Sequence, residues 1–446
     1  MCRQPFGSIP QSTSFMKLIR TIVLATAFVA SFALIGCGGT PNNVPVPLHP
    51  SAAAALSAAP LTPEAERQIY MNGARTAWTY FDRYYQPSTG LAWAHHKFAY
   101  TTMWDVASLM AATWSARELG LISQSAYDQR IRTMLSSLNR LKLVDGIAFN
   151  TFYDIKTLDM VGEDDKGTYR PTATGTGYSV TDLGRLLIWL KVLSLQPQHT
   201  QLATQVVNRL NMGVLVKDGY PRGMVIDGKA RHHYSETAAG YLQYASSGFA
   251  IWGQKVSPAL ELRNESKLVN VLGQRIYVDE RDSDRITSEP FIMMGLETGW
   301  FTPELRLQSE RVLRAQEERF RRTAILTLVS EDALPDPPYF FYYYSLYKDG
   351  DSFVVDGPGS NTRVDGPRWV SAKAAFGWHA LLPSPYTTAT LKAVQPAAIP
   401  GTGWGSGVYE RTLRPTGEPS LNTAALILES AAYKLKSRPF LSMRIQ

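Results

Sequence analysis

The stretch Phe98–Ala116 constrains the fold of this chain more than any other segment. It carries one ionisable residue, Asp105, in nineteen positions, and apolar or small residues cover every side of a helical period. A helix that is apolar all round is buried all round. The sequence therefore predicts a helix enclosed by other helices, with its carboxylate in the first turn, just after two threonines that can cap the helix.

The same pattern recurs in five further segments, each almost free of charge beyond its first turns. These are Tyr178–Leu190, Ser235–Gln254, Thr287–Leu296, Trp369–Pro383 and Pro419–Tyr433. We expect the six buried helices to begin near Thr102, Ser179, Glu236, Ser288, Val370 and Asn422.

Six amphipathic segments with a polar face alternate with the buried ones. They are Thr62–Tyr85, Ser125–Leu141, Gln198–Asn211, Ser257–Arg263, Thr302–Arg322 and Pro385–Val394. Amphipathic helices cover a core with one face only. The alternation predicts a mainly α fold, an (α/α)6 toroid in which six outer helices surround six inner helices.

Short β-hairpins interrupt this helical pattern. They are predicted at Val144–Val161, Val214–Tyr234, Leu268–Val278, Tyr339–Tyr347 and Trp404–Glu410. Each of them directly precedes an inner helix, so we expect the hairpins to gather at the mouth of the toroid where the inner helices begin.

The N-terminus has the features of a secretory signal. Basic residues precede an apolar run, Ile22–Ile35, that is too short to span a bilayer. Leu34–Cys37 resembles the bacterial lipobox, in which the cysteine is lipidated and becomes the mature N-terminus. We therefore expect a signal peptide over residues 1–36, with the true start at Met16, and a lipid anchor on Cys37. A plain cleaved signal is the alternative.

The rest of the chain is interpreted as a tether and one domain. Residues 37–60 are rich in Pro, Ala and Asn and carry no charge, which predicts a disordered tether. Residues 61–446 are predicted to form a single toroid domain. The predicted location is the bacterial cell envelope, on the periplasmic side of the outer membrane in a cell with two membranes.

Composition excludes several classes of function. Cys2 and Cys37 are the two cysteines, so the mature domain has neither a disulfide nor a thiolate metal site. The net charge of +7 falls to +4 without residues 1–36, because three of the 45 basic residues lie there and none of the 38 acidic ones does. This charge is too small to indicate nucleic-acid binding. The chain also has no Walker loop, dinucleotide fingerprint or Gly-x-Ser-x-Gly motif. We expect no cofactor and no metal.

Several dispersed motifs resemble a family of bacterial envelope proteins known only as a domain of unknown function. They are Thr101–Asp105, Leu183–Lys191, Ser288–Pro290, Ala315–Arg319, Ser330–Asp332, Lys373–Trp378 and Tyr409–Glu410. More distantly, Tyr153–Leu158 is similar to a loop of glucoamylase-like toroids, including bacterial β-1,2-glucan hydrolases. That resemblance implies glycoside hydrolysis, with inversion of configuration, but it transfers no catalytic residue.

Carboxylates in the first turns of inner helices are the catalytic candidates: Asp105, Asp182, Glu236 and Glu289. Glycoside hydrolysis needs a protonated carboxylic acid and a second carboxylate. We predict Glu289 as the acid, because the apolar residues after it should desolvate it. We predict Asp182 as the base, because Arg185 one turn later should keep it ionised.

Substrate-binding candidates are the aromatic and polar residues expected around the same mouth. They are Trp104, Tyr178, Arg185, Tyr234, Tyr241, Glu331, Asp332, Lys373, Trp378, Trp404 and Tyr409. They could stack on sugar rings and bind hydroxyl groups. The expected partner is a polysaccharide or oligosaccharide, such as an exopolysaccharide or periplasmic glycan, bound by a monomer.

Other interpretations stay open. Each first-turn acid could simply cap its helix, and Glu331 and Asp332 could simply end a strand. The acidic turn Asp279–Asp284 could bind calcium, although a solvated turn explains it as well. The histidine pairs His95–His96 and His232–His233 lack helical metal-ligand spacing, which favours structural roles. The protein could also be a non-catalytic glycan-binding lipoprotein, or a polysaccharide lyase in which Tyr234 abstracts a proton.

Overall fold

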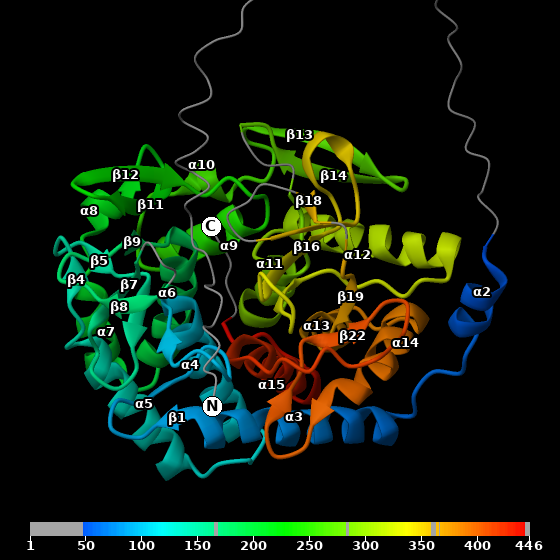
Figure 1. Ribbon diagram of the computed structural model, residues 1–446, viewed down its shortest axis with the longest axis horizontal. Coiled ribbons are helices and arrows are strands. Elements are labelled where there is room, and N and C mark those ends of the chain that lie inside the picture. The colour runs from blue at the N-terminus through cyan, green and yellow to red at the C-terminus, as the bar shows by residue number, and fades with distance from the viewer. Residues whose placement is uncertain (1–47, 165–167, 282–284, 358–362, 365, 442–446) are drawn as a thin grey trace, which may run out of the picture.

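The computed structural model describes residues 48–164, 168–281, 285–357, 363–364 and 366–441 (Figure 1). The predicted signal peptide, Cys37 and the first part of the tether lie outside these residues. No described helix combines the length and apolarity needed to cross a membrane.

Six buried helices form the centre of the described structure (Figure 1). They are α4 (Met103–Glu118), α6 (Val180–Ser194), α9 (Tyr241–Ala250), α11 (Glu289–Met293), α13 (Ala372–Leu381) and α15 (Leu421–Lys436). Helix α11 continues directly as a π-helix, η1 (Met294–Thr298). Each of these helices contacts the next in chain order, and α15 returns to contact α4. The central helices therefore form a closed ring.

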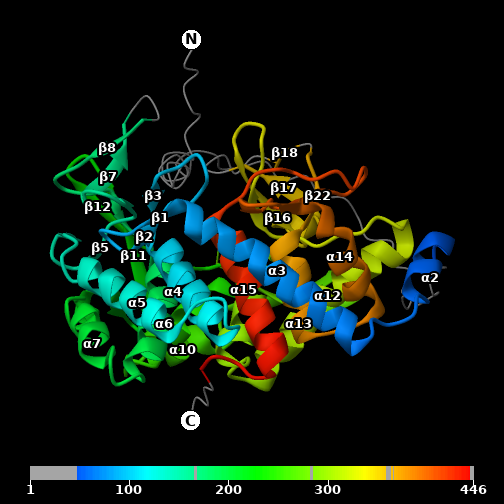
Figure 2. The same cartoon turned by 90° about the horizontal axis from the view of Figure 1, so that it is seen from below.

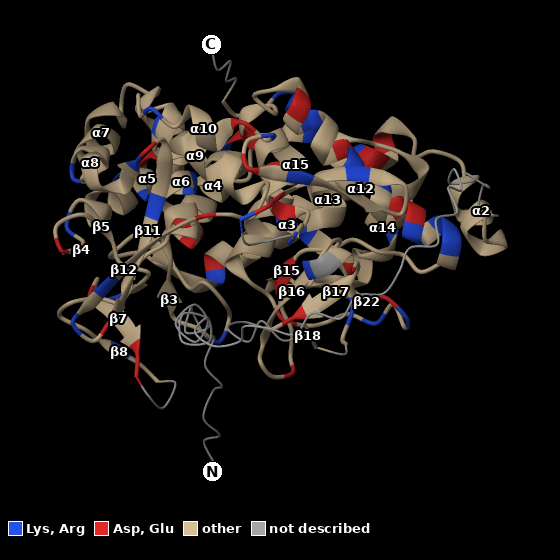
Figure 3. Cartoon of the chain, turned by 90° about the horizontal axis from the view of Figure 1, so that it is seen from above, with Lys and Arg blue, Asp and Glu red and all other residues tan. Residues whose placement is uncertain are grey.

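Outer helices cover this ring. They are α3 (Pro63–Tyr84), α5 (Gln124–Leu138), α7 (Thr200–Asn208), α10 (Ser257–Leu260), α12 (Pro303–Thr323) and α14 (Pro385–Ala393), with a further turn, α8 (Met212–Leu215). Helix α3 contacts α15 and α4, and α5, α7, α10, α12 and α14 contact α4, α6, α9, α11 and α13 in that order. Figure 3 shows charged residues of both signs along α12, whereas α9 and α13 are almost free of them. The structure is thus mainly helical, as predicted.

Side-chain caps fix where several inner helices begin. The Thr102 hydroxyl accepts a hydrogen bond from Asp105 N at 3.1 Å, and Asp105 Oδ2 accepts one from Thr102 N at 3.1 Å. Ser179 and Ser420 cap α6 and α15 in the same manner. Caps satisfy backbone N–H groups that have no partner within the helix. The predicted starts of these helices are therefore confirmed.

Two inner helices begin later than predicted. Helix α9 begins at Tyr241 rather than near Glu236, because Gly240 has a φ of 98°, which a helix does not contain. Helix α13 begins at Ala372, because Trp369–Ser371 pair as a strand with Gly407–Tyr409. Helix α10 is a single turn that ends at Leu260.

Twenty-two short strands accompany the described helices. Three sheets have four strands. The first contains β3 (Tyr100–Thr101), β6 (Phe152–Asp154), β7 (Met160–Glu163) and β8 (Tyr169–Pro171); the second contains β9 (Gly177–Tyr178), β10 (Val216–Lys217), β11 (Tyr220–Asp227) and β12 (Ala230–Ser235); the third contains β15 (Glu331–Ala333), β16 (Phe340–Tyr344), β17 (Val354–Asp356) and β18 (Arg363–Val364).

The remaining strands pair in twos. They are β1 (Tyr85–Gln86) with β2 (Leu91–Ala92), β4 (Leu143–Val144) with β5 (Ala148–Phe149), β13 (Ser266–Val271) with β14 (Gln274–Asp279), β19 (Trp369–Ser371) with β22 (Gly407–Tyr409), and β20 (Ala398–Ile399) with β21 (Gly403–Trp404). Short 3-10 turns lie at η2 (Lys348–Gly350) and η3 (Gln395–Ala397). Figure 2 shows most of the labelled strands on one side of the helices. The predicted hairpin regions therefore do contain strands, and most of those labelled in Figure 2 share a side.

The second half of the predicted tether is not disordered. Residues Pro50–Leu56 form helix α2, in which Ala52 is fully buried. This helix contacts α12 and α14, and His49 N donates a hydrogen bond to Arg321 O at 2.9 Å. Alanine has the highest helix propensity, which favours a helix in this alanine-rich segment. Packing against α12 and α14 stabilises this short helix further.

Candidate active site

A buried ion pair lies where α11 and α13 begin. Glu289, in the first turn of α11, is 2% exposed, and its Oε2 pairs with Nζ of Lys373 on α13. Its other oxygen accepts a hydrogen bond from Asn422 Nδ2 on α15 at 2.6 Å. One carboxylate thus connects three inner helices at the ends where they begin.

Lys373 is the cation of this cluster. Its Nζ lies 3.7 Å from Asp332 Oδ1 and donates a hydrogen bond to the backbone oxygen of Glu331 at 2.5 Å. Burial acts to lower the pKa of Lys373, but Asp332 and Glu289 outweigh it and raise the pKa. Asp332 is itself buried and accepts a hydrogen bond from Trp369 Nε1 at 2.8 Å. It therefore supports Lys373 and is not open to a ligand.

Glu331 is the acid in this cluster whose pKa is shifted furthest from its ordinary value. It is the first residue of β15 and keeps part of its side chain exposed. Burial raises its pKa to about 8, helped by the charge of Glu289, while Lys373 acts in the opposite direction. Tyr241, at the start of α9, shares a hydrogen bond with this carboxyl group. Glu331 is consequently protonated over much of the neutral pH range.

Glu236 and Asp182 approach from the α6 side. Glu236 Oε1 accepts hydrogen bonds from Thr237 N and Ala238 N, both at 2.9 Å, and Oε2 accepts one from the Thr181 hydroxyl at 2.9 Å. Three hydrogen bonds therefore fix the position of this carboxyl group. The charge of Glu236 also acts on Glu331, so the two partly exposed glutamates are neighbours.

Asp182 and Asp105 hold the beginnings of α6 and α4. Asp182 accepts hydrogen bonds from the Ser179 hydroxyl at 2.6 Å and from Trp104 N at 3.3 Å. Burial raises its pKa. Asp105 is 8% exposed and completes the cap of α4, and burial raises its pKa to about 6. Capping therefore accounts for the contacts of Asp105.

Arg185 lowers the pKa of Asp182 as predicted, but burial outweighs this effect and the arginine forms its ion pairs with other residues. It is fully buried, and its Nη2 lies 3.0 Å from Glu429 Oε1 and 3.4 Å from Glu297 Oε1. Its guanidinium also lies under the Trp104 ring, 4.7 Å from the ring centroid. The arginine therefore joins inner helices below the acids and is not available to bind substrate.

The surroundings of Glu289 and Asp182 match the predicted reasons only in part. Glu289 is desolvated as predicted, at 2% exposed, but its carboxyl group is paired with Lys373. Asp182 has a raised pKa, and the arginine expected to keep it ionised pairs with Glu297 and Glu429.

Partly exposed aromatic residues surround the acids. Trp104 meets Tyr241 edge to face, with ring centroids 6.0 Å apart. Tyr342 lies opposite Glu331 in the pairing of β15 with β16, and its ring stacks on that of Tyr344 at 6.0 Å. Tyr234, on β12, lies close to Glu236 and Asp182, and burial raises its pKa. A strongly raised pKa does not suit a tyrosine that must abstract a proton.

Other predicted substrate residues are buried away from this cluster. Trp378 and Trp404 are 0% and 1% exposed, and Trp404 donates a hydrogen bond to Gly73 O. Tyr178 is 1% exposed. A sugar ring cannot reach these faces. Tyr409 is partly exposed on β22, where burial raises its pKa and the charge of Asp336 adds to the effect.

Tyr342 and Asn422 are the main site residues that the sequence prediction omitted. Tyr342 lies within Tyr339–Tyr347, which was predicted only as a hairpin, and Asn422 was predicted only as the start of an inner helix. Their proximity to Glu331 and Glu289 depends on contacts between distant segments, so no local pattern indicates it. The acidic turn that begins at Asp279 lies partly outside the described residues.

Comparison with known proteins places the chain in a family. Residues 72–437 match the family model described as a protein of unknown function, DUF3131. The chain belongs to the DUF3131 family. A search of curated protein sequences finds no match for this DUF3131 protein.

Solved structures share the fold of the DUF3131 chain at low sequence identity. An endo-β-1,2-glucanase from Chitinophaga pinensis, in complex with sophorotriose and glucose, is 10% identical with a TM-score of 0.62; the match covers 84% of this chain and 93% of that one. A mutant endo-β-1,2-glucanase from Talaromyces funiculosus, in complex with β-1,2-glucan, is 12% identical with a TM-score of 0.56, over 86% and 87% of the two chains. A glucoamylase-like protein from Bacteroides fragilis is 12% identical with a TM-score of 0.60, over 85% and 93%. At these identities the likeness shows the fold.

Proposed function

We propose that this DUF3131 protein is a glycoside hydrolase of the bacterial envelope with an (α/α)6 toroid fold. The observation that carries the proposal is Glu331, a partly exposed carboxyl group beside Tyr241 whose pKa is raised to about 8 by burial and by the charge of Glu289. A glycosidase needs such a protonated carboxylic acid at neutral pH to donate a proton to the leaving oxygen.

Glu331 and Glu236 form the proposed catalytic pair. Glu331 donates the proton to the glycosidic oxygen, and Glu236, held by two backbone N–H groups and a hydroxyl, acts on water at the other face of the sugar. Burial and the negative charge of Glu289 raise the pKa of Glu331, and Lys373 pairs with Glu289. Asp182 and Asp105 are positioning residues for the beginnings of α6 and α4.

The proposed substrate is a glucan-like exopolysaccharide or periplasmic glycan. Trp104, Tyr241 and Tyr342 offer aromatic surface beside the acids, and aromatic faces commonly bind sugar rings. The fold shared with endo-β-1,2-glucanases supports a glucan. We propose that hydrolysis inverts the anomeric configuration and that the enzyme acts as a monomer. We also propose that the lipid on Cys37 holds it to the outer membrane, facing the periplasm.

Reducing-end release from a panel of glycans tests the proposal. Detergent-solubilised full-length protein is incubated with β-1,2-, β-1,3-, β-1,4- and α-linked glucans and with uronate polymers. Wild-type protein should release reducing ends from at least one glucan, and Glu331→Gln should reduce the rate by roughly 100-fold or more, the usual contribution of a general acid. NMR of the first product then gives its anomeric configuration.

The other outcomes of this experiment are equally informative. Tight binding of a glucan without any release of reducing ends would replace the proposal by the non-catalytic binder. Release of unsaturated products that absorb in the ultraviolet would indicate a lyase. Full activity of a folded Glu331→Gln variant would show that the assigned acid is wrong.

A further inference from the structure

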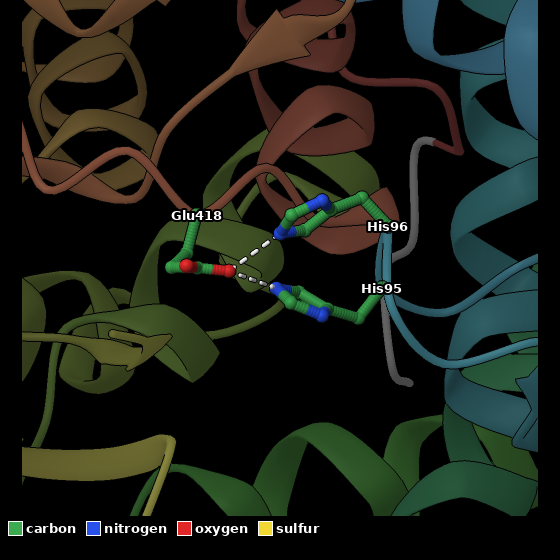
Figure 4. Close-up of side chains that lie close together, drawn as sticks. All are labelled: His95, His96 and Glu418. Atoms are coloured by element: carbon green, nitrogen blue, oxygen red, sulfur yellow. Dashed lines mark hydrogen bonds and ion pairs between the residues drawn. The ribbon is translucent and has the colours of Figure 1, made fainter. Parts of the chain in front are cut away.

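Two neighbouring histidines and a distant glutamate converge outside the candidate active site. His95 and His96 lie between β2 and β3, and Glu418 lies between β22 and α15. His96 Nε2 is 2.5 Å from Glu418 Oε2, and His95 Nε2 is 3.2 Å from the same oxygen. Figure 4 shows both rings turned toward that carboxylate. Two histidine nitrogens and one carboxylate oxygen, from two segments far apart in the sequence, thus converge.

The backbone holds these two segments together independently of the side chains. His96 N donates a hydrogen bond to Pro419 O at 3.3 Å, and Leu421 N donates one to Ala94 O at 3.0 Å. The Ser406 hydroxyl donates to Glu418 O at 3.2 Å. The ligand positions are therefore fixed by the fold, which lowers the entropic cost of binding an ion.

The side chains are shielded but still reachable. Their exposed fractions are 16% for His95, 20% for His96 and 8% for Glu418. His95 Nε2 is buried and makes no well-directed hydrogen bond, although it faces Glu418. Buried polar atoms normally have a partner. His95 Nε2, which can donate a lone pair to a metal ion, thus faces Glu418 without a hydrogen-bond partner of good geometry among the described residues.

We propose that His95, His96 and Glu418 bind a transition-metal ion of the zinc type. Two imidazole nitrogens and one carboxylate oxygen are the ligands of many zinc sites that keep a fourth position open. A single carboxylate provides too few oxygens for calcium or magnesium, whereas imidazole suits zinc, copper, nickel and cobalt. The proposal concerns a site separate from the proposed hydrolase chemistry and does not depend on it.

The geometry requires only a small adjustment. The three ligand atoms lie within 4.8 Å of one another. Tetrahedral ligands that each lie about 2.0–2.2 Å from one zinc ion are roughly 3.3–3.6 Å apart. His95 Nε2, 3.2 Å from Glu418 Oε2, is close to this spacing, whereas His96 Nε2, at 2.5 Å, must move outward. Lys97 Nζ binds the other oxygen of Glu418, Oε1, at 2.8 Å and leaves Oε2 to the histidines. Lys97 can remain paired with Glu418 Oε1 while the metal ion binds Glu418 Oε2.

The second histidine pair is a natural control. His232 and His233 are exposed neighbours on β12, where they pair with Val225 and Met224. Successive side chains of a strand point to opposite faces. Two such rings cannot converge on one ion.

Metal titration of full-length protein tests the site. Protein purified in detergent without a histidine tag and treated with EDTA is titrated with ZnCl2 by calorimetry and with CoCl2 by visible absorption. We expect one Zn2+ per chain, a cobalt spectrum typical of nitrogen–oxygen ligands, and at least tenfold weaker binding for His95→Ala, His96→Ala and Glu418→Gln. The double variant His232→Ala/His233→Ala should bind as wild type does.

Several outcomes would overturn the proposal. They are no stoichiometric binding by wild-type protein, binding that survives unchanged in folded His95→Ala and His96→Ala variants, and loss of binding in the His232→Ala/His233→Ala control. Circular dichroism verifies the fold of each variant. Because Glu418 also contacts Lys97, the two single histidine variants decide the result if Glu418→Gln unfolds.

Discussion

Glu289 and Glu331 are neighbouring glutamates with opposite surroundings. Glu289 has Lys373 and Asn422 as partners, whereas Glu331 has a tyrosine hydroxyl and the negative charge of Glu289. A carboxyl group next to an ammonium is stabilised as an anion, and one next to another anion is stabilised as an acid. Burial is the main cause of the raised pKa of Glu331; the charge of Glu289 adds to it, and Lys373 acts against it.

The pKa of Glu331 sets a pH dependence of activity. If Glu331 is the general acid, kcat/KM should hold to about pH 8 and fall above it, because the acid then loses its proton. A pH–rate profile of wild-type protein on its substrate measures this limb. A profile that declines already from about pH 5 would assign the acid to another residue.

The same group affects stability in a defined direction. The folded pKa of Glu331, about 8, lies above the ordinary value of 4.5, so its contribution to stability is present below pH 4.5 and is lost as pH rises through 8. Between about pH 5 and about pH 8.5 it should lower the free energy of unfolding by on the order of 2–4 kcal/mol. Urea unfolding of wild-type and Glu331→Gln protein should show this slope in the wild type and a flatter dependence in the variant. Equal slopes would mean that the carboxyl group is not shifted.

Removal of Lys373 should cost more than removal of the whole ion pair. Lys373→Met leaves the buried carboxylate of Glu289 without its cation, and such a loss typically costs about 3–5 kcal/mol. The double variant Glu289→Gln/Lys373→Met should be less destabilised than the single lysine variant. A double-mutant cycle by urea unfolding measures the coupling. Simple additivity would show that the ion pair contributes nothing.

At the scale of elements, capping residues in the sequence predicted where several helices begin, but they did not predict every start. Thr102 and Ser179 cap their helices through bonds within three residues, so their sequence alone predicted the starts. The start of α13 depends on strand pairing between Ser371 and Gly407, which are far apart in the chain. The site has the same limit: first-turn acids are visible in the sequence, but the pairs Glu289–Lys373 and Arg185–Glu429 join separate helices.

Close approach of two helices explains a glycine pair. A Cβ on Gly248 of α9 would overlap with Gly184 O of α6. Gly248→Ala must therefore push the two inner helices apart, and we expect a loss of about 2 kcal/mol or more in the free energy of unfolding. Gly213→Ala on α8 meets only Asn211 Oδ1, at 3.5 Å, and should change stability by less than about 0.5 kcal/mol. If the two variants unfold at the same urea concentration, the helices can separate freely.

At the scale of the whole molecule, the tether and the domain meet at α2. Because residues 50–56 pack on α12 and α14, the free part of the linker is shorter than the sequence predicted. If Cys37 carries the proposed lipid, this contact limits how far the domain can move from the membrane.

The proposed membrane anchor depends on one residue, Cys37. Changing Cys37→Ser should move the protein from the membrane fraction to the soluble periplasmic fraction of cells, because the thiol is the proposed site of the lipid. Fractionation and immunoblotting measure the shift, with wild-type protein as the reference that should remain in the membrane fraction. Membrane association that survives in Cys37→Ser would contradict the anchor.

The contact of α15 with α3 and α4 has a consequence for biosynthesis. The ribosome delivers the last helix long after the first ones, and until it arrives α3, α4 and α13 each lack an apolar neighbour. A chain without α15 therefore exposes apolar surface on these helices, which favours aggregation. A premature stop codon before Leu421 should yield a product that proteases degrade, so the last helix is as necessary to the fold as the first ones.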